Sequence, residues 1–340
     1  MRRKTYPPVQ RKKRWALKIL LTTLALFLAF VILVAATSLI KADRLMKGEI
    51  QAIPPYATNA LPSFRSVNIS SGKGQLTLRG WLIDADKGGN RGTIIMVHNQ
   101  GGNRLPFGLD TRPLLKHLSK LGFNILTFDL RHSGESSGNM SSFGYAEAED
   151  LEAAIHWVMA NVPQSPLILF GFGTGSTTLM RTLGKLEDDS KKSAIDPKEE
   201  ALSIQALDRI AAIIVDSPAR DIDAFIEASI RQENRPLLFW LATSTPYAIR
   251  LSVGNSEKED FFARFSSLSL PLMILGHEED SLLKESDYRP MIQERLRLQP
   301  QRTMTRLIPG RGHLTSYLED REAYLDGLTE FLDRWFPVTN

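Results

Sequence analysis

Hydrophobic positions divide this chain into one long apolar run near the N-terminus and a body in which short apolar runs alternate with helical ones. No charged residue occurs between Ile19 and Ile40. A helix rises about 1.5 Å per residue, so this run predicts a span of roughly 33 Å, close to the ~30 Å hydrocarbon core of a bilayer. We therefore expect a transmembrane anchor over residues 15–40.

The tail before this run, residues 1–14, is strongly basic. It holds seven basic side chains: Arg2, Arg3, Lys4, Arg11, Lys12, Lys13 and Arg14. The whole chain has a net charge of +4, so the remainder carries 4 − 7 = −3 and is mildly acidic. Basic residues beside an apolar span are attracted to anionic lipid, and they favour a cytoplasmic N-terminus. We predict a single-pass protein of the cell membrane with an extracytoplasmic body, a membrane-lipid partner and no nucleic-acid partner.

Two other interpretations of the apolar run stay open. Small residues at Ala35 and Ala36 would allow cleavage as a signal peptide, although signal peptides usually have a shorter apolar region of about 7–15 residues. A buried core helix is the second alternative, but the run lacks the amphipathic pattern of a helix with one buried face.

After a proline-containing linker over residues 41–62, the body over residues 63–340 alternates between strand and helix patterns. Strands are expected at Val67–Ile69, Leu76–Ile83, Thr93–His98, Asn124–Asp129, Leu167–Phe170, Ala211–Asp216, Pro271–Leu275 and Met304–Ile308. Helices are expected at Leu114–Leu121, Ala146–Met159, Thr177–Leu186, Ser286–Leu298 and Asp320–Trp335. The inner strands are apolar without interruption, which is typical of parallel strands covered on both faces. The pattern predicts an α/β fold with a doubly wound, mostly parallel sheet.

Two segments interrupt this alternation. Glu187–Glu200 is rich in charge and predicts a surface insertion. The segment over residues 221–265 contains apolar helical stretches without a strand, and we expect it to form a helical cap over the mouth of the site.

The sequence Gly171-Phe172-Gly173-Thr174-Gly175 follows an apolar strand and precedes a helix. This is the frame of the G-x-S-x-G nucleophile elbow, in which a sharp turn exposes a serine. The central position here holds Gly173, which has no side chain with which to attack a carbonyl. Glycine also suits the strained backbone of such a turn, which costs a residue with a Cβ about 1–3 kcal/mol.

Five further segments follow the same plan in the same order. They are His98-Asn99-Gln100-Gly101-Gly102, Asp129-Leu130-Arg131, Ile214–Pro218, Leu272–Asp280 and Pro309-Gly310-Arg311-Gly312-His313. Between Phe64 and Phe336 the chain resembles the α/β-hydrolase superfamily, in which elbow, acid and histidine occur in this order. It is most similar to the bacterial membrane-anchored or secreted hydrolases of the Bem46-like serine esterase and peptidase group.

This resemblance implies an eight-stranded α/β-hydrolase fold and hydrolysis of an ester, thioester or amide. It implies that His313 is the catalytic base and Asp280 its acid partner, with Glu279 as a rival because Gly276 and His277 stand in swapped order. The backbone N–H groups of Thr174 and Gln100 would form the oxyanion hole.

Four other residues of these segments bear on this picture. Asn99 replaces the glycine that the family carries after the histidine, which puts the shape of the oxyanion loop in doubt. His98 is expected to be structural, at the end of its strand. Asp129 and Arg131 are expected to hold a turn.

Without a serine at position 173 no acyl-enzyme can form there, and loss of a nucleophile costs about 10⁶ in kcat in a serine protease. The leading hypothesis is a pseudo-hydrolase that binds a small acyl or peptide ligand. An active enzyme would need a replacement nucleophile, Thr174, Ser176 or Ser217, or a water activated by His313. Gly173 as a substitution introduced into an ordinary serine hydrolase, and a purely structural membrane protein, are the remaining alternatives.

The chain contains no cysteine, which excludes disulfides, zinc–thiolate sites and a cysteine nucleophile. We expect neither a cofactor nor a metal. The ligand and the oligomeric state do not follow from the sequence.

Overall fold

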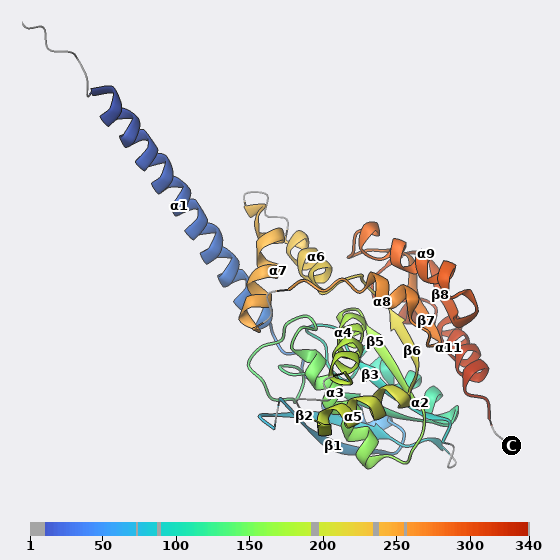
Figure 1. The fold of residues 1–340 in the computed structure, drawn as a ribbon. Coiled ribbons are helices and arrows are strands. Elements are labelled where there is room, and N and C mark those ends of the chain that lie inside the picture. The colour runs from blue at the N-terminus through green and yellow to red at the C-terminus, as the bar shows by residue number, and fades with distance from the viewer. Residues whose placement is uncertain are drawn as a thin grey trace, which may run out of the picture.

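The computed structural model describes residues 11–72, 74–86, 90–191, 197–233, 238–254 and 257–338. Most of the predicted basic tail and the middle of the predicted 187–200 insertion lie outside these residues. The described residues form one mixed sheet with helices on both faces and one long helix that projects from the body (Figure 1).

The sheet has eight strands in the order β1-β2-β4-β3-β5-β6-β7-β8. Their bounds are β1 Phe64–Ser71, β2 Leu76–Ile83, β3 Gly92–Val97, β4 Phe123–Phe128, β5 Leu167–Phe172, β6 Ile210–Asp216, β7 Leu272–Asp280 and β8 Thr303–Gly312. The strands from β4 to β8 are parallel, and β1 and β2 extend the sheet with antiparallel pairing. Every predicted strand is present, and the predicted fold class is confirmed.

Helices cover both faces of this sheet. They are α2 Thr111–Lys120, α3 Glu147–Asn161, α4 Thr174–Asp189, α5 Pro197–Arg209, α6 Ile222–Gln232, α7 Leu241–Ser252, α8 Phe262–Ser267, α9 Arg289–Leu298, α10 Ser316–Glu319 and α11 Arg321–Trp335. Successive residues of a strand point to opposite faces, so Ile94 and Met96 of β3 join the core under α2 and α11. Ile95 and Val97 join the core under α3, α4 and α6.

Helix α1, Arg11–Met46, is 36 residues long. Its part from Trp15 onward is long and apolar enough to cross a membrane. In the most apolar stretch of 18 residues, 0% of the residues are buried in the protein. That exposure contradicts the interpretation of this run as a buried core helix. The helix continues past Ile40 into the predicted linker, and Ala42 and Met46 in its last turns are buried in the core of the body.

Helix α5 was not predicted. It begins inside the segment expected to be a surface insertion, and of its side chains only Ser203 and Ala206 are buried. So small a buried surface leaves little apolar pattern in the sequence. The predicted cap segment forms α6, α7 and α8, of which α7 packs beside the end of α1 and α6 packs on α7 (Figure 1).

Candidate active site

A sharp turn at Gly173 connects β5 to α4 at the carboxyl edge of the sheet. Gly173 has φ 52° and ψ −117°, a conformation that residues with a Cβ rarely adopt. Its N–H donates to the carbonyl of Asp216 on β6 at 2.9 Å. The flanking Gly171 and Gly175 let the helix lie against the strands, because a Cβ at Gly175 would overlap the carbonyl of Val97. The turn therefore has the shape expected of a nucleophile elbow.

The side chain of Asn99 fills the space in which a side chain at position 173 would stand. A Cβ built on Gly173 would lie 2.6 Å from Asn99 Oδ1 and 3.1 Å from Leu314 Cδ1. Both distances are shorter than ordinary van der Waals contact. Position 173 lacks a side chain while position 99 carries one, and the two features are sterically complementary.

Side-chain oxygens accept from both backbone donors that were predicted to form the oxyanion hole. The Thr174 N–H donates to Asn99 Oδ1 at 2.9 Å, and the Gln100 N–H donates to Thr174 Oγ1 at 2.7 Å. In this structure both donors are therefore engaged by side chains, and their role as an oxyanion hole stays a prediction. The physical reason for the engagement of Thr174 is Asn99, whose amide oxygen stands where an oxyanion would bind. A ligand carbonyl could reach the Thr174 donor only by displacing that amide.

The acid and the histidine meet at the ends of β7 and β8. His313 Nδ1 lies 2.7 Å from Asp280 Oδ2. The other carboxylate oxygen of Asp280 accepts from the backbone N–H groups of Leu282 and Leu283, each at 2.8 Å. Glu279 is exposed. Of the two candidate acids it is Asp280 that contacts His313.

The second ring nitrogen of His313 faces no polar group. Nε2 is buried and has no hydrogen-bond partner among the described residues, and the side chain is 10% exposed. The ring of Phe225 on α6 lies beside it, with centroids 6.0 Å apart. In a serine hydrolase this nitrogen takes the proton of the nucleophile. Here the acid–base pair is present without a hydroxyl at position 173 for it to activate.

The three candidate replacement hydroxyls are engaged in other contacts. Thr174 Oγ1 accepts from the oxyanion loop as described above, and Ser176 Oγ donates to the Gly173 carbonyl at 2.6 Å. Ser217 Oγ donates to Asp216 at 2.9 Å and accepts from the Leu314 N–H at 3.2 Å. Each hydroxyl would have to give up a buried hydrogen bond before it could attack a substrate.

His98 occupies a structural position at the end of β3. Its Nε2 accepts from the Leu130 N–H at 3.0 Å, and its Nδ1 lies 2.8 Å from the Asn99 carbonyl. Burial lowers the pKa of His98, so the ring is neutral, with its proton on Nδ1. It ties the oxyanion loop to the turn after β4.

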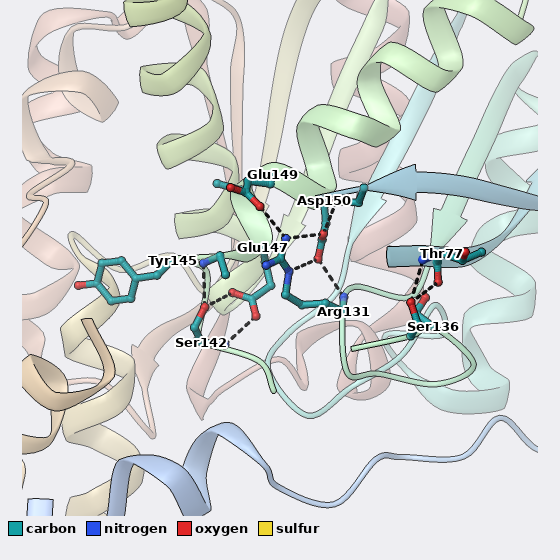
Figure 2. A network of polar contacts seen from close by, with 12 residues as sticks. Thr77, Arg131, Ser136, Ser142, Tyr145, Glu147, Glu149 and Asp150 are labelled. Carbon is teal, nitrogen blue, oxygen red and sulfur yellow. Dashed lines mark hydrogen bonds and ion pairs between the residues drawn. The ribbon is translucent and has the colours of Figure 1, made fainter. Parts of the chain in front are cut away.

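The turn after β4 is held by buried ion pairs. Asp129 accepts from the backbone N–H of Arg104 at 2.7 Å and from its guanidinium. Figure 2 shows Arg131 directed toward Asp150 and Glu149 of α3, at 2.8 and 3.1 Å. Asp150 is fully buried. These contacts give Asp129 and Arg131 the turn-holding positions that we expected.

A second part of this network supports the oxyanion loop. Glu147 accepts from the Ser142 N–H and hydroxyl, at 2.6 and 2.8 Å (Figure 2). Burial raises the pKa of the Glu147 carboxyl. The neighbouring Ser141 Oγ accepts from the side-chain amide of Gln100 at 2.5 Å, and the Phe143 N–H donates to the same amide at 3.1 Å. The loop before α3 thus holds the side chain of Gln100 in place.

Two cavities share Asn99, Gln100 and Gly101 in their walls. The first has a volume of about 200 Å³ and extends toward Phe107 and Phe172. The second has a volume of about 310 Å³. Its remaining walls include Leu45 at the end of α1, Gly48 and Glu49 just after it, Phe143, Thr174, and Phe225 and Ser229 of α6. The second cavity lies between the projecting helix and the cap, beside the vacant nucleophile position.

Residues 94–326 match the family model described as "Alpha/beta hydrolase family". The matched segment is more than half of the chain and includes the turn at Gly173, Asp280 and His313. The chain belongs to the alpha/beta hydrolase family.

Individual relatives agree with this assignment. The chain is 34% identical to the lysophosphatidylserine lipase ABHD12 of Mus musculus over 221 residues, which are 63% of this chain and 46% of that protein. It is 24% identical over 245 residues to the uncharacterized protein YqkD of Bacillus subtilis, covering 71% of each. Against the lipase, the chain therefore spans less than half of the relative's length.

Among solved structures the fold is similar to an esterase of Pyrococcus furiosus. The TM-score is 0.63 at 21% identity, over 86% of this chain and 98% of the esterase. At this identity the similarity shows the alpha/beta hydrolase fold alone. The finer resemblance to the Bem46-like group stays a prediction.

A cluster of three acidic side chains has the spacing of a metal site. Carboxylate oxygens of Glu152, Asp189 and Glu199 lie within 4.8 Å of one another. Lys185 Nζ lies 2.9 Å from Glu152, 2.7 Å from Asp189 and 3.8 Å from Glu199. The ammonium group already supplies the positive charge that these oxygens require, so we assign no metal to them.

Sequence analysis missed two features of the site. The engagement of the oxyanion donors by Asn99 was one, although the paired departures at positions 99 and 173 were a usable signal. The participation of Leu45, Gly48 and Glu49 in a cavity wall was the other. Nothing local in that segment indicates a tertiary contact with the oxyanion loop.

Proposed function

We propose that this protein is a membrane-anchored pseudo-hydrolase that binds a small acyl ligand without cleaving it. The observation that carries the proposal is the side chain of Asn99. It occupies the volume of the absent nucleophile side chain and accepts the hydrogen bond of the Thr174 N–H. A site in this arrangement offers neither an attacking hydroxyl nor an open oxyanion hole, and these two supply most of the catalysis of serine hydrolases.

The ligand class and the membrane anchor have separate support. The cavity of about 310 Å³ is lined by apolar side chains that include Leu45, Phe143 and Phe225 and by seven polar or charged side chains, which suits a short acyl chain with a polar end. The exposed apolar surface of α1 supports a transmembrane anchor, which by its basic tail would leave the body outside the cell membrane. The lipase and esterase names of the relatives also favour an acyl compound.

An active hydrolase is the second candidate, and one observation favours it. The contact between His313 and Asp280 is retained at 2.7 Å, so an acid–base pair is available if Asn99 swings away. Such an enzyme would act through a water molecule or through Ser217, the candidate hydroxyl closest in sequence to the end of β6. It would have to expose the buried Nε2 of His313 first.

The deciding experiment restores the missing parts of the site in the full chain, purified in a mild detergent. Gly173→Ser alone would meet Asn99, so we design Gly173→Ser together with Asn99→Gly. We expect the parent to be inactive on a short p-nitrophenyl ester and unreactive toward a fluorophosphonate probe. We expect the double variant to hydrolyse the ester and to take the label, with Gly173→Ser alone well below it.

Adding His313→Ala to the double variant is the control, since it should abolish the new activity. Asn99→Gly alone should stay inactive. If the parent itself turns over the ester and His313→Ala removes that turnover, the pseudo-hydrolase proposal is wrong and the second candidate takes its place.

Binding is tested separately with a short-chain fluorescent fatty acid, in protein that keeps its own residues at positions 99, 173 and 313. Ser229→Trp places a large side chain in the wall of the cavity of about 310 Å³ and should weaken binding strongly. Ser252→Trp, on the exposed end of α7, is the matched control and should bind like the parent. Equal binding by all three proteins would place the ligand outside this cavity.

A further inference from the structure

Helix α7 and the described tip of the α6–α7 hairpin, residues 238–240, lie along the part of α1 that has no charged residue. Trp240, just before α7, stacks edge-on against Phe30 with ring centroids 5.8 Å apart, and its indole N–H donates to Thr37 Oγ1 at 3.1 Å. Further along, the hydroxyls of Ser38 and Ser244 lie 2.6 Å apart. Contacts later in α7 fall later in α1, so the two helices run in the same direction. The start of α7 therefore points away from the body.

The contact with Phe30 fixes the depth of the hairpin relative to α1. Phe30 lies about 16 Å along the helix from Lys41, the first charged residue after the apolar run, at about 1.5 Å per residue. A bilayer core is ~30 Å thick. Any bilayer that covers the uncharged run of α1 therefore also surrounds Phe30 and the ring of Trp240 beside it.

The exposed surface of this hairpin is suited to lipid. From Leu238 to Ile249 there is no charged residue, a length of about 18 Å as a helix. Phe239 is 75% exposed, and Tyr247 is 50% exposed. Aromatic side chains are enriched where proteins enter membranes, and here they stand on a segment that carries no charge.

Two charged residues near the apolar segment are paired within the described part of the chain, and a third, Arg235, lies outside that part. Glu233 at the end of α6 forms an ion pair with Lys41 of α1. Arg250 forms an ion pair with the buried Asp223. Pairing lowers the cost of bringing these groups near hydrocarbon, because it reduces the charge that is desolvated.

We propose that the tip of the α6–α7 hairpin is inserted into the bilayer beside α1, as a second membrane contact that does not span. The inference rests on the proposed transmembrane position of α1 and goes beyond it. It places the cavity between α6 and the end of α1 at the boundary between lipid and water. A ligand then reaches the site from the membrane surface without crossing the aqueous phase.

The absence of cysteine from the chain allows a direct test with single-cysteine variants of the full protein. Phe239→Cys reports on the hairpin tip. Phe27→Cys, at a 62% exposed position inside the apolar run of α1, is the membrane reference. Ile204→Cys, 42% exposed on α5 and away from α1 in Figure 1, is the aqueous reference. Each is labelled with a nitrobenzoxadiazole fluorophore and reconstituted into phosphatidylcholine vesicles with or without spin-labelled lipid.

We expect the spin-labelled lipid to quench the label at Phe239→Cys and at Phe27→Cys, and not at Ile204→Cys. Quenching at Phe27→Cys without quenching at Phe239→Cys would overturn the hairpin inference and leave the anchor in place. No quenching at either position would overturn the anchor as well. Disulfide-linked dimers of unlabelled Phe239→Cys, together with a label protected from lipid, would show that a second copy of the chain covers the tip instead.

Discussion

Gly173 and Asn99 form the centre of the site at the scale of single residues. The glycine accepts a backbone conformation of φ 52°, and the asparagine fills the volume that the glycine leaves. The sequence predicted the vacancy, because the glycine replaces a serine in a recognisable frame. It did not predict that the vacancy is filled, since that depends on where two loops far apart in the chain meet.

Gly173→Ala should destabilise the protein more than an alanine substitution at a glycine where only the backbone is strained. The added Cβ meets both a strained φ and Asn99, so we expect a loss of about 1–3 kcal/mol from strain and a further loss from crowding. Gly101→Ala is the matched control, because Gly101 has φ 73° with nothing within 4 Å of its Cβ position. Chemical denaturation of both variants in detergent makes the comparison. Equal losses would show that Asn99 moves aside at little cost.

The buried His98 should make the protein less stable in acid. Burial lowers the pKa of His98 in the folded state, while an unfolded histidine titrates at about 6.5. Its contribution to stability is therefore full above about pH 6.5 and is lost as the pH falls toward the lowered folded pKa. His98→Gln keeps an acceptor for the Leu130 N–H and should lose less stability between pH 7.5 and pH 5.5. The same loss in parent and variant would contradict this role.

At the scale of elements, the sequence was most informative where the apolar pattern within a single strand or helix indicates its type. All eight strands were predicted, because buried parallel strands read as continuous apolar runs. Helix α5 was missed because it buries little. The cap was located as a segment, but its folding into α6, α7 and α8 depends on contacts with α1 and α9 that no local pattern records.

The turn between β4 and α3 depends on the ion pair of Arg131 with the fully buried Asp150 (Figure 2). Arg131→Ala would leave that carboxylate buried without its partner, and we expect it to cost about 3 kcal/mol or more. Arg306→Ala is the control, since it removes an exposed pair with Glu330 that is worth about 1 kcal/mol or less. Urea denaturation of the two variants measures the difference. A small loss for Arg131→Ala would mean that water reaches Asp150.

At the scale of the whole molecule, the projecting helix and the body form one packed unit. Met46 and Ala42 of α1 are buried in the core, and the carbonyl of Met46 accepts from the Ser141 N–H at 2.9 Å. A linker was predicted here because Lys41 ends the apolar run. The predicted end of the membrane segment at Ile40 stays a prediction, whereas the helix itself continues to Met46 because its next turns pack on the body.

Met46→Ala should therefore destabilise the body, although the residue lies only one or two turns after the predicted anchor over residues 15–40. Removing a buried methionine side chain costs about 2–5 kcal/mol. Leu39→Ala, at a 51% exposed position of the same helix, should have little effect. Thermal unfolding followed by near-ultraviolet circular dichroism compares them. Equal melting temperatures would show that the end of α1 is not part of the cooperative unit.

The docking of α1 on the body also decides which ligand concentration controls binding: the concentration in solution or the concentration in the membrane. A body on a flexible tether would move through the solution above the membrane, and its binding would depend on the ligand concentration in that volume. With its last turns packed in the core, an α1 anchored as we propose would hold the cavity at a fixed height beside its leaflet. Occupancy then follows the mole fraction of ligand in that leaflet, so diluting vesicles of constant composition leaves it unchanged, and molecules on a facing membrane stay out of reach.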